Sequence, residues 1–234
     1  MKLKSWVGLL LGAILPATMA HAASVGINFT GKPSQPLSAS TKVGVVPQKH
    51  WNNLTIDSSD PNGHSNGGSL AKLKNDAGKV VKGMSVMVEA APGAGVWAIN
   101  GATWGFSGSK RKLEKGLIWP HPLIKIKGIP YKKYNVYVYV SAGNNAGLAK
   151  VHIAGQSGKV DSHSTYFCRF NWQGGNFAKA TTTTLAAAKR KGHGGNYVEF
   201  KGNTAKDIDL NCNGALASWV GFSAVQIVSA DGKK

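Results

Sequence analysis

Short strand-like runs, separated by turn-forming residues, recur along this chain and limit the folds that it can adopt. The clearest runs cover residues 25–30, 85–90, 123–129, 134–141, 148–154, 165–170, 196–201, 207–211 and 219–228. Glycine, asparagine, proline and serine lie between them, and glycine alone accounts for 30 of the 234 residues. Many short strands with frequent turn signals are typical of β-sandwiches. The sequence therefore predicts an all-β fold, a single jelly-roll β-sandwich with mostly antiparallel strands and long Gly/Asn-rich loops.

Two of these runs predict different positions within a sheet. In residues 123–129, isoleucines alternate with Lys125 and Lys127, a pattern typical of a strand with one buried face. In residues 134–141, valines alternate with tyrosines, so both faces are apolar. We expect that strand, and the long apolar run 219–228, to lie in the middle of a sheet.

Helical patterns are scarce in this sequence. Only residues 68–82 and 181–191 have a composition compatible with a helix, and the second begins with four threonines before its alanines. We expect a loop or one short helix at 181–191. No composition shift or internal repeat divides the chain, so one β-sandwich domain is expected over residues 23–234.

The N-terminus has the three parts of an export signal. Residues 1–4 are basic, residues 5–19 are apolar, and Ala20-His21-Ala22 has the small-x-small form that signal peptidase cleaves. The sequence predicts a signal peptide at 1–22 and a secreted, periplasmic or cell-surface mature protein.

A retained membrane anchor is the alternative interpretation of this N-terminus. Gly12 and Pro16 interrupt the apolar run, and the run is shorter than a comfortable membrane-spanning helix. We therefore expect no membrane span.

The charge balance is strongly basic and indicates anionic partners. The chain contains 28 Lys+Arg against 10 Asp+Glu, a formal net charge of +18. Outside the cytoplasm such a charge attracts acidic polysaccharide, lipopolysaccharide or extracellular nucleic acid. Solubility with weak adhesion to any anionic surface is the simpler alternative.

One segment combines basic and aromatic residues. Its cations are Lys110, Arg111, Lys112, Lys115, Lys125, Lys127, Lys132 and Lys133, and they surround Trp119. Flat aromatic rings stack on sugars or bases, and stacking contributes about 1–3 kcal/mol per base in single-stranded nucleic acid. The candidate ligand contacts here are Trp104, Trp119, Lys125 and Lys127. In the alternative interpretation Trp119 is a core residue and the lysines belong to a solvated loop.

Residues 44–56 (GVVPQKHWNNLTI) interrupt a strand-like pattern with a tryptophan and two asparagines. With Leu54 facing inward, Asn52 shares the inward face and needs hydrogen-bond partners there, most easily backbone groups of a loop. Asn52 is therefore predicted to clamp a loop from inside. Trp51 and Asn53 share the other face and are candidate ligand contacts, although a structural role is the favoured interpretation for the pair.

Cys168 and Cys212 are the two cysteines of the chain. An even number of cysteines in an exported protein favours a disulfide. Two cysteines without a CxxC motif do not make a four-ligand zinc site. The sequence therefore predicts a Cys168–Cys212 disulfide.

Signatures of catalysis are absent from the sequence. It contains no HExxH, no GxSxG and no setting for a nucleophilic cysteine, which favours a protein that is not an enzyme. Asp207 and Asp209 would lie on one face of a strand, a spacing that permits paired carboxylate chemistry but is more often plain surface.

No cofactor is expected. The one candidate metal site is a turn in which Asp57, Asp60 and Asn62 supply oxygen atoms that calcium prefers, and the same residues also suit an ordinary turn.

Four stretches together resemble the galactose-binding-like β-sandwich domains of exported bacterial proteins, a group that includes carbohydrate-binding modules and discoidin-type domains. The stretches are residues 44–54 (GVVPQKHWNNL), 128–140 (GIPYKKYNVYVYV), 195–201 (GNYVEFK) and 221–228 (GFSAVQIV). The resemblance implies a glycan site either in the loops at one end of the sandwich or on a concave sheet face. Fold alone does not carry function.

The leading functional hypothesis is a non-catalytic, exported protein that binds glycans or associates with an extracellular matrix and favours acidic polymers. A structural or surface protein that binds protein partners or assembles with itself is the first alternative. An exported nucleic-acid binder is the second.

Overall fold

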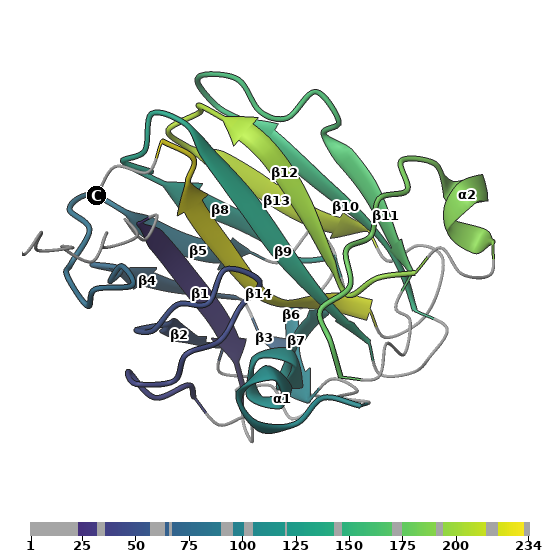
Figure 1. The fold of residues 1–234 in the computed structure, drawn as a ribbon, viewed down its shortest axis with the longest axis horizontal. Helices are drawn as coiled ribbons and strands as arrows, with labels where there is room; N and C mark the ends of the chain where they lie inside the picture. The colour runs from purple at the N-terminus through teal and green to yellow at the C-terminus, as the bar shows by residue number, and fades with distance from the viewer. Residues whose placement is uncertain are drawn as a thin grey trace, which may run out of the picture.

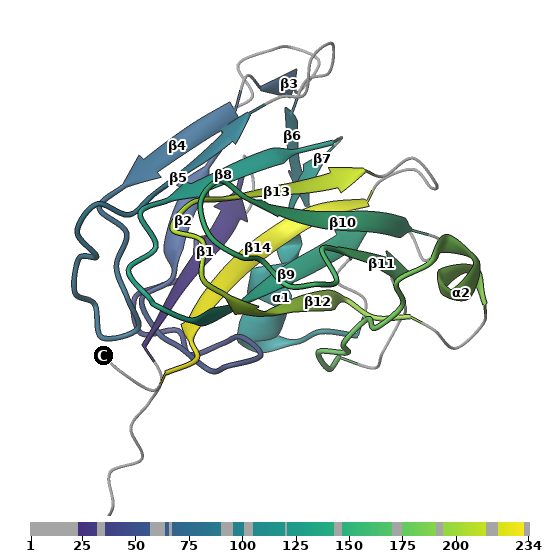
Figure 2. The same cartoon turned by 90° about the horizontal axis from the view of Figure 1, so that it is seen from above.

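Two β-sheets pack face to face to form a β-sandwich (Figures 1 and 2). The computed structural model describes residues 23–31, 36–56, 64–65, 67–89, 96–100, 105–119, 121–142, 147–169, 175–190, 194–213 and 220–231. Strands β1 and β2 pair in parallel, and the other strand pairs of these residues are antiparallel. The predicted all-β sandwich is confirmed.

The larger sheet has eight strands and the smaller has six. The first contains β1 (Ser24–Thr30), β2 (Asn52–Thr55), β3 (His64–Ser65), β6 (Val96–Asn100), β7 (Gly116–Trp119), β9 (Tyr134–Ala142), β12 (Tyr197–Asn203) and β14 (Val220–Ser229). The second contains β4 (Gly67–Ala71), β5 (Ser85–Glu89), β8 (Leu123–Lys127), β10 (Leu148–Gly155), β11 (Thr165–Arg169) and β13 (Ile208–Asn213). From β8 to β10 and again from β11 to β14, the chain crosses between the sheets at each step, as in jelly-roll sandwiches.

Strands β9 and β14 pair with each other in the middle of the larger sheet, as the two-sided apolar patterns predict. The valines of β9 and Val225 and Ile227 of β14 face the core between the sheets. The opposite face of β9 carries Tyr137 and Tyr139, which belong to a second apolar cluster outside the larger sheet.

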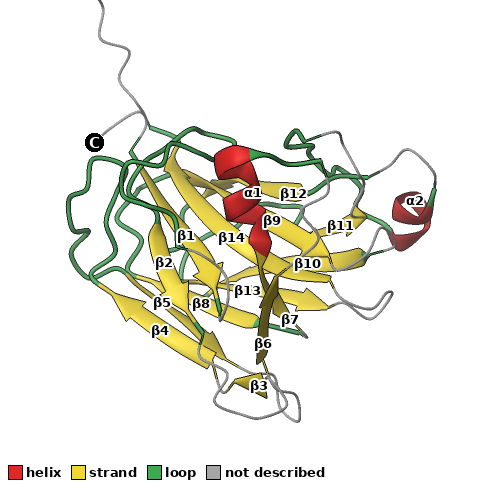
Figure 3. Ribbon diagram, turned by 90° about the horizontal axis from the view of Figure 1, so that it is seen from below, coloured by secondary structure: helices red, strands yellow, loops and turns green. Residues whose placement is uncertain are grey.

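A second layer covers the outer face of the larger sheet. The segment 36–51 contributes Leu37, Val43 and Trp51, and α1 (Gly108–Lys115) contributes Leu113. Figure 3 shows α1 lying across this face, against β14 and β9. This layer explains why a strand in the middle of the sheet is apolar on both sides.

The helices match the expectation at one of the two predicted places. A short helix α2 (Leu185–Lys189) forms within 181–191, whereas residues 68–82 contain part of β4 and a hairpin instead of a helix. The sequence pattern also misses α1, whose eight residues are mostly charged. A helix this short is marginal in isolation, so its packing on the sheet stabilises it.

The predicted Cys168–Cys212 disulfide is wrong, since both cysteines are free and buried. Cys168 on β11 pairs with Ala149 of β10, and Cys212 on β13 pairs with Val151 of the same strand. Strand β10 therefore lies between the cysteines. Two inter-strand spacings amount to roughly 9–10 Å, beyond the roughly 7 Å that a disulfide can bridge between Cα atoms.

We expect both thiols to be unreactive in the folded protein. Burial raises the pKa of Cys212 to about 12 and raises the pKa of Cys168 well above its ordinary value. The thiolate is the reactive form, so a thiol-specific reagent should label neither cysteine at pH 8 and both in guanidinium. Failure to label either cysteine in guanidinium without a reductant would show that a disulfide forms after all.

Candidate ligand-binding groove

Trp51 lies inside the protein. Its side chain is only 4% exposed, its indole Nε1 donates a hydrogen bond to the carbonyl oxygen of Val43 (3.2 Å), and its ring meets Tyr139 edge-on. A Cβ atom on Gly26 would lie 2.5 Å from the Trp51 ring, so glycine at this position makes room for the indole. The structure thus places Trp51 between segment 36–51 and the larger sheet, and its ring is not presented to a ligand.

A buried polar network holds segment 36–51 onto the sheet. The Tyr139 hydroxyl donates to Gln226 Oε1 (2.9 Å) and accepts from the backbone N–H of Val45 (2.7 Å). Gln226 Nε2 donates to the carbonyl of Val46 (2.6 Å) and to Gln48 Oε1 (2.8 Å). Satisfied buried hydrogen bonds of this kind fix one arrangement of a loop.

The predicted role of Asn52 as an internal clamp is confirmed. Its Nδ2 donates to the carbonyls of Gly26 (2.9 Å) and Lys74 (2.8 Å), and its Oδ1 accepts from the backbone N–H of Lys74 (2.7 Å). Asn52 therefore ties β2 to the base of the loop that follows β4.

Asn53 is also engaged within the fold. Its amide exchanges two hydrogen bonds with the backbone of Leu37, both 2.9 Å, and its Oδ1 accepts from Asn28 Nδ2 (2.9 Å). Its polar atoms hold segment 36–51 in place, which is the structural role that the sequence favours.

The other candidate ligand contacts lie elsewhere. Lys125 and Lys127 project from β8 on the outer face of the smaller sheet, across the sandwich from Trp51, and Lys125 forms an ion pair with Glu89 (2.6 Å). Trp119 ends β7 and is partly buried, and Trp104 lies outside the described residues. The structure therefore does not bring the predicted contacts together into one site.

A groove lies at the end of the sandwich where β1 begins and β14 ends. It encloses about 510 Å³ and is lined by residues from segments 75–81 and 130–132 and by Ala23, Ser229 and Asp231. We call it the end groove. Ligand-binding pockets commonly enclose about 300–1,000 Å³. In Figures 1 and 2 the last residues of β14 lie far from α2, which marks the other end of the molecule.

One wall of the end groove is a hairpin at residues 72–83. Lys74 and Val80 form an antiparallel bridge, and Asn75 Oδ1 accepts from the backbone N–H groups of Ala77 (3.1 Å) and Lys79 (2.9 Å). An asparagine that bonds its own turn in this way is a typical turn former. Because Asn52 holds Lys74 from inside, the start of β2 also positions this wall.

The opposite wall is the turn at residues 130–133. Tyr131 is partly buried there, and burial, together with the negative charge of Asp76, raises the pKa of its phenol to about 12. Tyr131 therefore presents a neutral ring and hydroxyl at physiological pH. Such a residue suits a ligand with an apolar face and a polar edge.

The charge around the end groove is positive. The hairpin carries Lys72, Lys74, Lys79 and Lys82, and the turn adds Lys132 and Lys133. The acidic residues of the hairpin, the turn and the groove lining are Asp76 and Asp231. Lys132 and Lys133 belong to the basic cluster of the sequence, for which Trp119 was the predicted centre. Four lysines around the pair Val80-Val81 were the signal that would have indicated this end.

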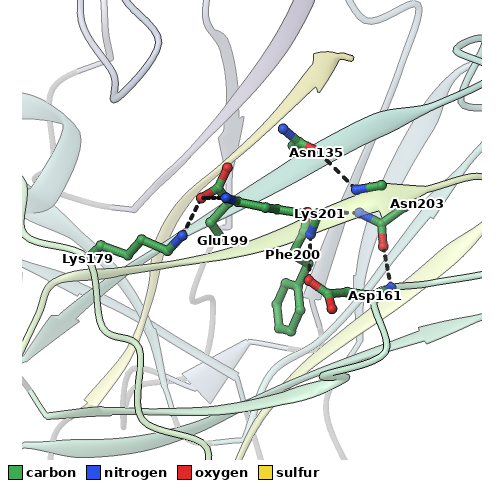
Figure 4. A network of polar contacts seen from close by, with 8 residues as sticks. Asn135, Asp161, Lys179, Glu199, Phe200, Lys201 and Asn203 are labelled. Atoms are coloured by element: carbon green, nitrogen blue, oxygen red, sulfur yellow. Dashed lines mark hydrogen bonds and ion pairs between the residues drawn. The ribbon is translucent and has the colours of Figure 1, made fainter. Parts of the chain in front are cut away.

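Several carboxylates form hydrogen bonds and ion pairs within the fold. Asp161 accepts hydrogen bonds from the backbone N–H groups of Lys201 (2.6 Å) and His163 (2.9 Å), beside the ion pairs of Glu199 with Lys179 and Lys201 (Figure 4). Asp207 accepts from the backbone N–H of Gly128 (2.8 Å), and Asp209 accepts from Gln156 Nε2 (2.6 Å).

The described ranges contain no cluster of three or more His, Cys, Asp or Glu residues able to hold a metal ion. The candidate calcium turn at residues 57–62 lies outside those ranges, as does the expected signal peptide. Within the same part of the chain, no helix is both long and apolar enough to cross a membrane.

Comparisons with protein-family models, with curated proteins and with solved structures find no match for this chain.

Proposed function

We propose that this chain is an exported, non-catalytic β-sandwich of the galactose-binding-like type that binds acidic glycans in the end groove. Residues 1–22 would direct its export, and their cleavage would release the mature protein outside the cytoplasm. The β-sandwich architecture and a groove formed by loops at one end support the glycan-binding part of the proposal.

The observation that carries the proposal is the composition of the end groove. The ring of Tyr131 offers a face for a sugar, and Lys79 and Lys132 lie in the same lining, where they can bind a carboxylate or sulfate. Stacking supplies contact area, while the cations select acidic over neutral polymers. An exported protein with an excess of basic residues is suited to such ligands.

Replacing Lys79 and Lys132 together by serine should weaken binding to a polyuronate such as alginate by about tenfold, since roughly 1.4 kcal/mol of lost charge-assisted contact is a factor of ten in affinity. The measurement is binding of the mature protein to immobilised alginate at low and at high salt, with a neutral glucan for comparison. Salt should weaken the alginate complex because it screens exposed charges.

The matched control is the Lys189→Ser, Arg190→Ser double variant. It removes the same charge at the end of α2, away from the end groove (Figure 1). Equal losses for both double variants would mean that total charge alone attracts the polymer, and the proposed site would then be rejected. Equal binding of alginate and neutral glucan would reject the preference for acidic polymers.

A further inference from the structure

The most exposed apolar feature of the described residues is Val80, at the end groove. It is the one large hydrophobic side chain among them that is mostly exposed, at 55%. Exposed apolar side chains are ordinary when they are isolated, but Val80 lines two hollows of the surface.

Hydrogen bonds fix Val80 in this exposed position. Val80 forms a β-bridge with Lys74 across the hairpin. The next residue, Val81, donates from its backbone N–H to the carbonyl of Leu73 (2.7 Å). At the tip, Asn75 donates to the carbonyl of Lys79 (2.9 Å). With the backbone held on both sides, Val80 does not reach the core without breaking the hairpin.

Val80 also lines a second hollow. It encloses about 430 Å³ and is lined by residues 71–72 and 80–85. Its lining contains Val80, Val81 and Met84 and two cations, Lys72 and Lys82, without an acidic residue. The two hollows share Val80 and Val81, so these valines join them into one apolar surface. Its linings also contain Lys72, Lys79, Lys82 and Lys132.

This surface differs from what a polysaccharide alone requires. Sugars bind through flat aromatic faces and polar groups, and aliphatic side chains such as Val80 and Val81 offer them little. A hydrocarbon chain would remove these side chains from water, and fully burying a valine side chain contributes about 1.5–3 kcal/mol. The lysines in the linings of the two hollows would then neutralise an anionic head group.

We propose that the natural ligand of the end groove is an anionic amphiphile, an acidic lipid or glycolipid whose aliphatic chain lies across Val80 from one hollow to the other. This rests on the proposed function, because the acidic head group occupies the lysine and Tyr131 part of the same groove. The ligand binds as a single molecule.

The test uses dodecyl phosphate below its micelle concentration, with ethyl phosphate as the ligand that lacks the chain, measured by calorimetry with the mature protein. Dodecyl phosphate should bind at least about tenfold more tightly, and Val80→Ser should remove about a tenfold advantage, in line with the transfer free energy of one valine side chain. Val80→Leu, which keeps an apolar side chain, should retain the advantage. Because Val80 is exposed, thermal unfolding should show that both variants are folded.

Equal binding of dodecyl phosphate and ethyl phosphate would overturn the inference, as would a Val80→Ser variant that binds the amphiphile as well as the parent. Binding to vesicles of phosphatidylglycerol without binding to dispersed dodecyl phosphate would also overturn it in favour of docking on a lipid surface. Alginate binding distinguishes the two proposals, because alginate has no aliphatic chain: its loss in the lysine double variant tests the glycan proposal, whereas the advantage of dodecyl phosphate over ethyl phosphate tests the amphiphile. If alginate binds and the amphiphile does not, the glycan proposal stands alone.

Discussion

Replacing Trp51 by alanine should lower the free energy of unfolding by about 3–5 kcal/mol, the usual cost of truncating a buried large aromatic residue. The indole fills the space between segment 36–51 and the larger sheet, where it contacts Tyr139 and bonds the carbonyl of Val43. Its loss leaves a cavity and removes one of two hydrogen bonds to the Val43 carbonyl, which also accepts from the backbone N–H of Gln48 (3.1 Å). Urea denaturation followed by circular dichroism measures the change.

Two variants separate the packing of Trp51 from its hydrogen bond. Trp51→Phe keeps most of the ring but loses the indole N–H, so we expect a smaller loss than for alanine, of about 1–3 kcal/mol. Gly26→Ala should also destabilise the protein, since its Cβ atom would lie 2.5 Å from the Trp51 ring. If Trp51→Ala lowered the free energy of unfolding by less than about 1 kcal/mol, the effect would match a surface substitution. Trp51 would then again be a candidate ligand contact.

Alternation along single strands was readable from the sequence. The valines and tyrosines of residues 134–141 predicted a strand with two apolar faces, and β9 indeed lies between the core and an outer layer. Asn52 was identifiable as a clamp because an inward asparagine must find partners. Both predictions depend on local periodicity, which the strand backbone imposes directly.

Features that depend on the order of strands in a sheet could not be predicted from local periodicity. The expected disulfide failed because β10 lies between Cys168 and Cys212, and no local pattern indicates which strand separates two others. The end groove was missed for a related reason. Its lining comes from both ends of the domain and from two separate loops, which only the folded chain brings together.

Helix α1 was missed because its stability does not come from its own sequence. Most of its residues are charged, and only Leu113 and Glu114 are buried against the sheet. A buried leucine and a buried glutamate next to each other give no apolar stripe. The helix is therefore defined by the surface on which it packs.

Replacing Glu114 by glutamine should stabilise the protein at neutral pH, and the gain should grow as the pH rises. Glu114 is 0% exposed, and Ser223 Oγ donates to its Oε2 (3.1 Å), while its Oε1 has no hydrogen-bond partner. Burial raises the pKa of this carboxyl well above its ordinary value, and the bond from Ser223 offsets only part of that rise. The folded protein therefore favours the neutral acid.

The sign of the pH dependence follows from proton binding. Between the ordinary pKa of glutamate and the raised pKa of Glu114, the unfolded chain has released this proton while the folded protein retains it. The contribution of Glu114 to stability is then complete below the ordinary pKa and falls with rising pH by at most about 1.4 kcal/mol per pH unit. Glutamine has no such proton, so it removes this slope.

The measurement is urea unfolding of the parent and of Glu114→Gln at several pH values from 4 to 8, and the quantity of interest is the difference between the two proteins. Taking the difference cancels the titration of the other acidic groups, which both proteins share. Glu114→Asp is the matched control, since it keeps an ionisable carboxyl and should retain a pH dependence. A constant difference across this range would show that Glu114 is not held as the neutral acid. A difference that grows with pH would show that the buried carboxyl at the contact between α1 and β14 weakens the fold as the pH rises, because Glu114 and Ser223 join those two elements.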